Sequence, residues 1–311
     1  MWFGAGPFPD VDASVRVAAF RWLRTQVDLH GDSLPWSVLS QGFDFDGRRV
    51  PLLGQQGIFK PAVLPEIPLS IRTSHDGPYP DEVTPDGSFH YCYRGTDPSH
   101  RDNRGLRMAW REMTPLIYFF GVAPGRYEAI WPVFVVGDDP ARLVFTVVAD
   151  DARFAEVAAS ESPSGIGARE AEGRRAYVTA AVRVRLHQRR FRERVLLAYR
   201  EECTLCRLRH RGLLDAAHII PDRDPHGEPL VKNGLSLCKI HHAAFDHQLI
   251  GVRPDYIVEV HPRVLKEEDG PMLRHGLQGM HNTSLHLPRA KADHPDRERL
   301  EERYRKFRGA A

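Results

Sequence analysis

Two short motifs of residues that commonly bind metal ions, in the second half of the chain, constrain its fold more than any other feature. Cys203 and Cys206 form a CxxC pair, and Cys238 and His241 form a CxxH pair further along. A CxxC turn presents two thiolates to one tetrahedral ion, and a second pair one helical turn apart completes a closed shell of protein ligands. Because that shell leaves no position for water, the spacing predicts a structural zinc ion. A redox-active CxxC, the alternative, would require neither the second pair nor the histidine.

The composition is that of a soluble globular protein, with 42% hydrophobic and 27% charged residues in a chain of 311. The sequence has no apolar run of roughly 18 residues, and its N-terminus, MWFGAGPFPD, lacks the basic-then-apolar pattern of a signal peptide. We therefore expect a cytoplasmic protein. Four cysteines in a chain of this length do not make a disulfide framework, and Cys92, in an aromatic run, is expected to be a small buried residue.

The residue pattern of the first half of the chain is typical of a β-rich domain. Residues 11–30 carry apolar side chains near helical spacing, which predicts an amphipathic opening helix. From residue 36 to 151, short β-rich pieces alternate with Gly, Pro and Asp turn signals. Strands this short and regularly spaced predict a compact barrel or sandwich, with one helix near residues 106–113.

A polar stretch separates this domain from the cysteine motifs. Residues 152–175 contain SPSGIG and show little periodicity, so we expect a linker there. Apolar side chains then predict a helix over 176–199, and the tail DRERLEERYRKFR predicts a short C-terminal helix. The expected organisation is a β-rich recognition domain at 1–151, the linker, and a second domain at 176–311.

Positive charge is concentrated just before the cysteine motifs. The formal charge of the whole chain is only +2, but ten arginines and three glutamates lie between Arg183 and Arg211, a local surplus of seven. Such a patch binds phosphates by displacing counterions, whereas a solvated helix face is the alternative. The candidates for contact with a nucleic acid backbone are Arg183, Arg185, Arg189 and Arg190.

A second set of polar residues overlaps the cysteine frame. His218 lies in AHI, Asn233 in NGL, and His242 directly follows His241. Their order on a strand, a loop and a helix resembles the HNH endonuclease family, whose module is two β-strands and a helix around one divalent metal ion. The resemblance covers roughly residues 176–310 and matches these three residues to the family's first histidine, central asparagine and last histidine. It implies that the chain hydrolyses phosphodiester bonds in DNA.

The chemistry explains why these residue types are needed. Phosphodiester hydrolysis requires a base that activates water, a Lewis acid that takes up charge on the leaving oxygen, and positioning of both. The neutral imidazole of His218 can take the proton of water near neutral pH. The resemblance implies that Asn233 orients the strand carrying His218 and that His242 binds Mg2+ or a similar divalent ion.

The second protein ligand of that ion is left open by the sequence. Many HNH proteins have an acid or a second histidine directly before the base, where this chain has Ala217. Asp215 lies three positions before His218, which on a strand places it on the opposite face. Asp246 follows the last motif histidine by four residues, on the same helix face, and is the candidate ligand. His247 is a further candidate.

A nuclease module of this size has little sequence discrimination of its own, so the β-rich domain suggests targeting. The architecture resembles modification-dependent restriction endonucleases, in which a PUA- or SRA-like domain reads a modified base and an HNH domain cuts. The resemblance implies an α+β chain that restricts foreign DNA carrying 5-methyl- or 5-hydroxymethylcytosine. A modified base is read most easily when flipped out between aromatic faces, and the candidates for its pocket are Tyr79, Asp81, Tyr91 and Tyr93.

Two alternatives remain. The first is an HNH nuclease that reads an unmodified sequence or a phosphorothioate mark. The second is a DNA-binding protein that keeps the HNH frame only for its zinc. Because one HNH site cuts one strand, we also hold a homodimer as a hypothesis for cleavage of both strands of a duplex.

Overall fold

The computed structural model describes residues 11–75, 88–150, 186–222 and 224–309. The chain divides into two compact units, Met1–His187 and Gln188–Ala311. The stretch predicted to be a linker, 152–175, lies outside the described residues. Among the described residues, no helix is long and apolar enough to cross a membrane.

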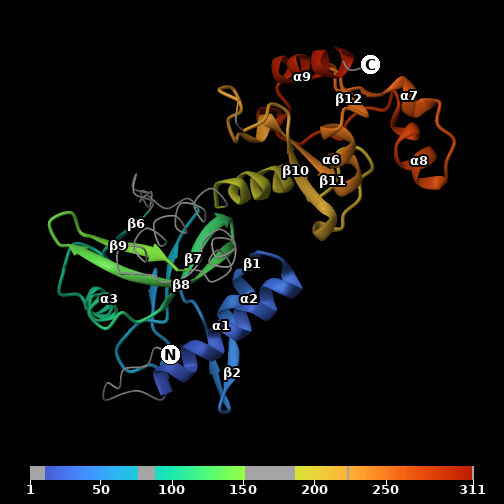
Figure 1. Cartoon of the computed structure of the whole chain (residues 1–311). Helices are drawn as coiled ribbons and strands as arrows, with labels where there is room; N and C mark the ends of the chain where they lie inside the picture. Colours follow the sequence, from blue (N-terminus) through green and yellow to red (C-terminus); the bar gives the residue numbers. More distant parts are fainter. Residues whose placement is uncertain (1–10, 76–87, 151–185, 223, 310–311) are drawn as a thin grey trace, which may run out of the picture. The chain divides into compact units, whose positions relative to one another are not determined.

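The first unit is built on one seven-stranded sheet with the path β4-β5-β7-β8-β9-β6, and β1 pairs with β8 off this path. The β5–β7 pair is parallel, and the other pairs are antiparallel. Register shifts interrupt the pairing of β8 with β7 and with β9, and such irregularities bend a sheet. Figure 1 shows the sheet curling around β7 and β8. Its strands are β1 (Ser33–Pro35), β4 (Ile58–Phe59), β5 (Ser70–Thr73), β6 (Phe89–Cys92), β7 (Leu116–Ala123), β8 (Arg126–Asp139) and β9 (Val144–Ala149).

Strand β7 separates two cores. Every residue of β7 is buried, and successive side chains of a strand point to opposite faces. Ile117 and Phe119 therefore join the core beneath helix α1 (Val11–His30). Tyr118 and Phe120 join the core that contains Leu106 and Ala109 of helix α3 (Arg101–Arg111). A strand buried on both faces explains the continuous apolar run LIYFFGVA.

The α+β fold class and the barrel-like character of the first unit are confirmed, with differences in detail. Helix α1 spans residues 11–30 as predicted. Helix α3 begins at Arg101, earlier than predicted, because the His100 side chain accepts a hydrogen bond from the Asp102 amide and caps it. The segment predicted to be β-rich begins with a helix, α2 (Trp36–Gln41), which the sequence pattern did not predict. A small hairpin of β2 (Phe43–Phe45) and β3 (Arg48–Val50) follows it.

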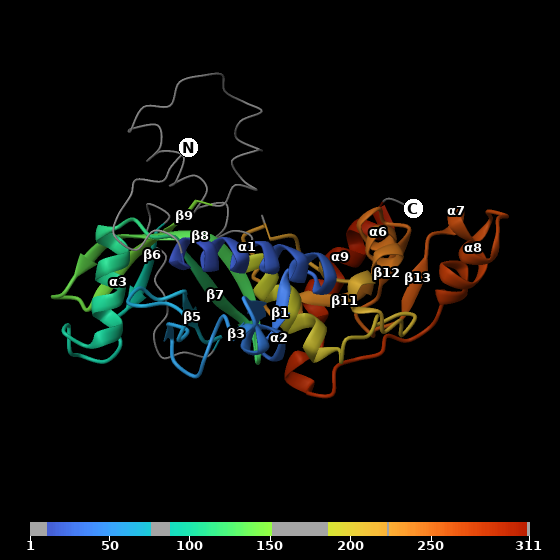
Figure 2. The same ribbon diagram turned by 90° about the horizontal axis from the view of Figure 1, so that it is seen from below.

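The second unit is centred on two antiparallel strands and a helix: β10 (Leu214–His218), β11 (Gly234–Cys238) and α6 (Lys239–Asp246). The three elements lie together in Figure 1, and Figure 2 shows β11 and α6 from another side. Residues 186–198 are helical and precede them. The predicted C-terminal helix is α9 (Arg297–Gly309), whose Phe307 packs so closely on Gly251 that a Cβ there would lie 2.5 Å from the ring. The remaining elements are β12 (Ile250–Val252), β13 (Val258–Val260), α7 (Pro262–Leu265), α8 (Pro271–Gly276) and the 3-10 turns Arg211–Leu213, Val231–Asn233, Gln278–Met280 and Lys291–Asp293.

Candidate active site and metal centre

The four residues of the two metal-type motifs come together in the second unit. Ligand atoms of Cys203, Cys206, Cys238 and His241 all lie within 4.8 Å of one another. The Sγ atoms of Cys203 and Cys238 are 3.4 and 3.3 Å from His241 Nδ1. Tetrahedral zinc, with bonds of about 2.0–2.3 Å, separates its ligand atoms by similar distances. The cluster could therefore hold zinc.

Two further features of the cluster suit a metal ion. His241 Nε2 lies 2.6 Å from the backbone oxygen of Gly276, so the imidazole can donate there and keep Nδ1 free for a metal. Hydrogen bonds from Cys203 and Cys206 lower the pKa of the Cys238 thiol, although burial opposes the shift, and hydrogen bonds with Cys203 and Cys238 raise the pKa of Cys206. The thiolate favoured at Cys238 is a form that binds a cation. Because Cys238 ends β11 and His241 lies in α6, occupation of the cluster would fix the angle between strand and helix.

His218 is the last residue of β10 and pairs with Gly234 of β11. Its imidazole stacks on the ring of Phe191, with centroids 3.9 Å apart and planes tilted by 18°. A Cβ at Gly234 would lie 2.5 Å from Val195 Cγ2 and 2.9 Å from Phe191 Cζ, so a glycine is needed for this close approach. The helical segment 186–198 thus packs tightly on the end of the strand pair and fixes the plane of the half-buried imidazole.

Asn233 is fully buried directly before β11 and closes the loop that follows His218. Its Oδ1 accepts a hydrogen bond from the amide of Ile220 at 2.9 Å, and its Nδ2 donates to the carbonyl of the same residue at 3.0 Å. The Nδ2 also donates to the backbone oxygen of Glu228 at 3.0 Å. The side chain thus lies across the loop beside the strand that carries His218, the position that the family resemblance implies.

His242 lies on α6 between two carboxylates. Its Nε2 is 3.3 Å from Asp246 Oδ2, and its Nδ1 is 3.7 Å from Asp215 Oδ2. The side chains of His242 and Asp215 are about one quarter exposed, at 23% and 28%, whereas that of Asp246 is 56% exposed. His247 is exposed at the end of the helix. Asp215 and His218 lie on opposite faces of β10, as side-chain alternation along a strand predicts. Alternation does not predict that the Asp215 side chain reaches His242 on α6.

Asp215 and His242 shift each other's pKa. The Asp215 carboxylate raises the pKa of His242; burial opposes this shift, and the charge of Asp246 adds to it. Burial of Asp215 would raise the pKa of its carboxyl group, but the neighbouring His242 and Lys239 outweigh burial and hold that pKa well below its usual range. The imidazole of His242 thus lies between two carboxylates, a donor set that suits a hard or borderline divalent cation.

The candidate phosphate-binding arginines lie on or before the helical segment. Arg183 and Arg185 lie outside the described residues. Arg189 and Arg190 are half-buried on the segment 186–198. The structure therefore brings two of the four candidates onto the helix that also supplies Phe191, the stacking partner of His218.

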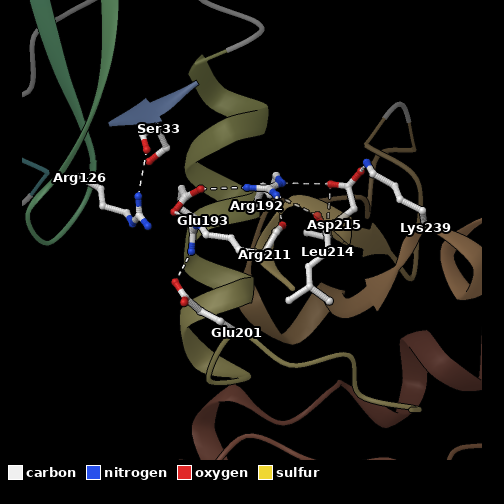
Figure 3. A network of polar contacts seen from close by, with 10 residues as sticks. Ser33, Arg126, Arg192, Glu193, Glu201, Arg211, Leu214, Asp215 and Lys239 are labelled. Carbon is white, nitrogen blue, oxygen red and sulfur yellow. Dashed lines mark hydrogen bonds and ion pairs between the residues drawn. The ribbon is translucent and has the colours of Figure 1, made fainter. Parts of the chain in front are cut away.

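Other arginines of the charged stretch are paired within the unit. Glu193 is 1% exposed and accepts from Arg192 at 3.0 Å and from Arg211. Arg211 also donates to Glu201, and Arg209 donates to Glu202 at 2.6 Å. Figure 3 shows the network around Glu193 extending through Arg192 toward β10. Part of the local positive surplus is thus neutralised by partners inside the fold.

The candidates for a base pocket lie in or beside the sheet of the first unit. Tyr79 and Asp81 lie outside the described residues. Tyr91 and Tyr93 share one face of their segment, as alternation predicts, and each is only 6% exposed. Tyr93 stacks on Phe145 at 4.5 Å, and its hydroxyl lies between Arg107 and Asp138. Both tyrosines belong to the core on the α3 side of the sheet.

Comparison with known proteins finds a similarity for part of the chain. Residues 203–253 match the family model described as HNH endonuclease. No curated protein matches the chain. A solved structure of a "Modification dependent TagI restriction endonuclease" resembles it with 16% sequence identity, a TM-score of 0.28, and coverage of 78% of this chain and 82% of that chain.

The matched segment begins at the first cysteine of the metal-type cluster and ends after β12. It therefore contains both strands, helix α6 and all three polar residues of the second motif set. Over this segment the second unit is similar to the HNH endonuclease family.

Proposed function

We propose that the chain is a metal-dependent DNA endonuclease whose HNH domain hydrolyses phosphodiester bonds. The arrangement of His218, Asn233 and His242 carries this proposal. A half-buried imidazole ends one strand, a buried amide locks the loop behind it, and a second imidazole faces a carboxylate on the adjoining helix. A domain retained only for its zinc would not require an imidazole at His218 or at His242.

His218 is proposed as the general base. Stacking on Phe191 fixes the plane of its ring, and Asn233 fixes the loop that follows it, so the imidazole is held in one orientation. Holding a base in a fixed position removes part of the entropic cost of the reaction. An imidazole can accept a proton from water near neutral pH, which sets up attack of that water on phosphorus.

His242 and Asp246 are proposed to hold the catalytic divalent ion. Their facing atoms are 3.3 Å apart, a separation that two ligands of one ion can have. Mg2+ or a similar ion would supply Lewis acidity to the phosphate and to the leaving oxygen. We further propose that Cys203, Cys206, Cys238 and His241 hold a structural zinc ion that fixes α6 against the strands.

Double-stranded DNA carrying modified cytosine is the proposed substrate, and restriction of such DNA is the proposed role. A separate unit with its own two cores accompanies the HNH domain, and reading a modified base is a task that a small nuclease module does not perform alone. We propose that Arg183, Arg185, Arg189 and Arg190 contact the phosphate backbone. Tyr79, Asp81, Tyr91 and Tyr93 are the proposed candidates for the base pocket, of which Tyr91 and Tyr93 could take part only if their packing in the core opened.

Cleavage of matched DNA substrates tests the proposal. Plasmids carrying cytosine, 5-methylcytosine or 5-hydroxymethylcytosine would be incubated with the protein and Mg2+, Mn2+, Co2+ or Ni2+. We expect cutting of the modified plasmids, sparing of the unmodified one, and no cutting by His218→Ala. Equal cutting of all three plasmids would exclude modification dependence, and binding without cutting under any metal would exclude the nuclease. A monomer that nicks circles without linearising them would count against the homodimer.

A further inference from the structure

We propose that Asp215 is a positioning residue for His242. Its carboxylate holds the Nδ1 side of the imidazole and thereby presents Nε2, together with Asp246, to the divalent ion. This inference rests on the proposed function, because it assigns a role in binding the catalytic ion. It gives the strand β10 a part in that site although Ala217 occupies the position of the usual ligand.

The two nitrogens of His242 face different carboxylates. Nδ1 lies 3.7 Å from Asp215, in ion-pair range, and Nε2 lies 3.3 Å from Asp246. A histidine that binds a metal through one nitrogen commonly directs the N–H of the other to a carboxylate, which fixes the tautomer and makes the ligating nitrogen more basic. Asp215 and Asp246 thus take the two roles that such a histidine needs.

The Asp215 carboxylate is itself held from several sides. Its Oδ1 accepts from the amide of Ala216 at 2.9 Å and lies 3.4 Å from Arg192 Nε. Its Oδ2 accepts from Lys239 Nζ at 2.9 Å. Arg192 is anchored in turn by a hydrogen bond of 2.8 Å to the backbone oxygen of Leu214, as Figure 3 shows. A carboxylate fixed in this way can fix the imidazole beside it.

These contacts also favour positioning over direct ligation. Each oxygen of Asp215 already faces a cation, Arg192 at Oδ1 and Lys239 at Oδ2, which weakens its attraction for a further cation. Asp246 has the more accessible carboxylate, at 56% exposed, and its nearest cation, Arg303, is 3.7 Å from Oδ1. The ligand atoms at this site are therefore those of His242 Nε2 and Asp246, and Asp215 acts through the imidazole.

Binding of Mn2+ to the full-length, zinc-loaded protein tests the inference. Titrations followed by electron paramagnetic resonance would compare wild type, Asp215→Ala, Asp215→Asn and His242→Ala. Loss of an outer carboxylate typically weakens metal affinity by about 10–100-fold, and we expect that loss for Asp215→Ala. Because the amide oxygen of Asn can still accept from Nδ1–H, Asp215→Asn should recover part of the affinity.

A matched control separates positioning from general damage to the fold. Glu201→Ala removes another carboxylate of the same region, one that binds Arg211 and has no contact with His242 among the described interactions. It should lower the melting temperature as Asp215→Ala does, but leave Mn2+ affinity unchanged. Equal loss of Mn2+ affinity in both variants would overturn the inference, because the effect would then be structural.

The outcomes distinguish this inference from the proposed function. If wild type shows no Mn2+ site that His242→Ala removes, the proposed catalytic ion is wrong and the inference fails with it. If that site exists and Asp215→Ala retains full affinity, only the role of Asp215 is wrong. A change in the Mn2+ coordination environment of Asp215→Asn with no recovery of affinity would identify Asp215 as a direct ligand and would also overturn the inference.

Discussion

Asn233 and Ile220 are joined by two hydrogen bonds, one in each direction between the side-chain amide and the backbone of the same residue. This pairing mimics the ladder of a β-sheet and closes the loop just after the strand that carries His218. The asparagine is fully buried, so neither group has water as an alternative partner. The central asparagine of the motif therefore acts on the shape of the site.

Replacement of Asn233 should reduce stability and cleavage together. Asn233→Ala leaves the amide and carbonyl of Ile220 and the carbonyl of Glu228 without these partners. Each buried unsatisfied group costs about 1–3 kcal/mol, so thermal unfolding of the second unit should occur at a clearly lower temperature. Asn233→Asp should be no milder, because a carboxylate cannot donate to the Ile220 carbonyl. A full rate of cleavage in Asn233→Asp would contradict this account.

The stack of His218 on Phe191 leads to a separate prediction. Phe191→Leu keeps an apolar side chain in the core but removes an aromatic contact that is typically worth about 0.5–1.5 kcal/mol. We expect single-turnover cleavage to slow by about two- to tenfold, since tenfold corresponds to about 1.4 kcal/mol, while DNA affinity stays unchanged. Leu196→Met, a change in the same helical segment and the same core, should leave the cleavage rate at the wild-type level.

Only part of the site could be predicted from the sequence. Residues whose roles depend on local order, such as His218, Asn233 and His242, follow from the motif because strand, loop and helix are consecutive. The approach of Asp215 to His242 could not be predicted in this way. It depends on how α6 packs against β10, a tertiary angle that no residue spacing specifies.

The same limit applies to charge and burial. Counting residues predicted a positive surplus before the cysteines, but not that Glu193 would be buried between Arg192 and Arg211. Alternation predicted that Tyr91 and Tyr93 share a face. Which face meets the core depends on the curl of the whole sheet, and both rings lie inside.

Removal of the proposed zinc ion should unfold the second unit before the first. The cluster connects the segment before β10, the end of β11 and helix α6, and burial of Cys203, Cys238 and His241 without an ion is unfavourable. Cys238→Ser should lower zinc content, measured by plasma mass spectrometry, and should abolish cleavage. Cys92→Ser in the first unit is the matched control and should retain both zinc and cleavage. Wild-type zinc content in Cys238→Ser would contradict the assignment of the ligands.

Lowering the pH should weaken the contacts that Glu259 makes with Tyr304 and Arg308 of the C-terminal helix. The Tyr304 hydroxyl donates to this carboxylate and lowers its pKa; burial opposes the shift, and Arg308, 2.8 Å away, adds to it. A carboxyl group whose pKa is lower in the folded state stabilises the fold above its unfolded pKa, about 4.3 for glutamate, and loses that contribution as pH falls through the folded value. Urea unfolding at pH 6 and at lower pH should therefore show a smaller acid-induced loss of stability in Glu259→Gln than in wild type. Glu268→Gln, at an exposed position, should follow wild type, and an unchanged acid response in Glu259→Gln would show that the Tyr304 contact does not couple α9 to pH.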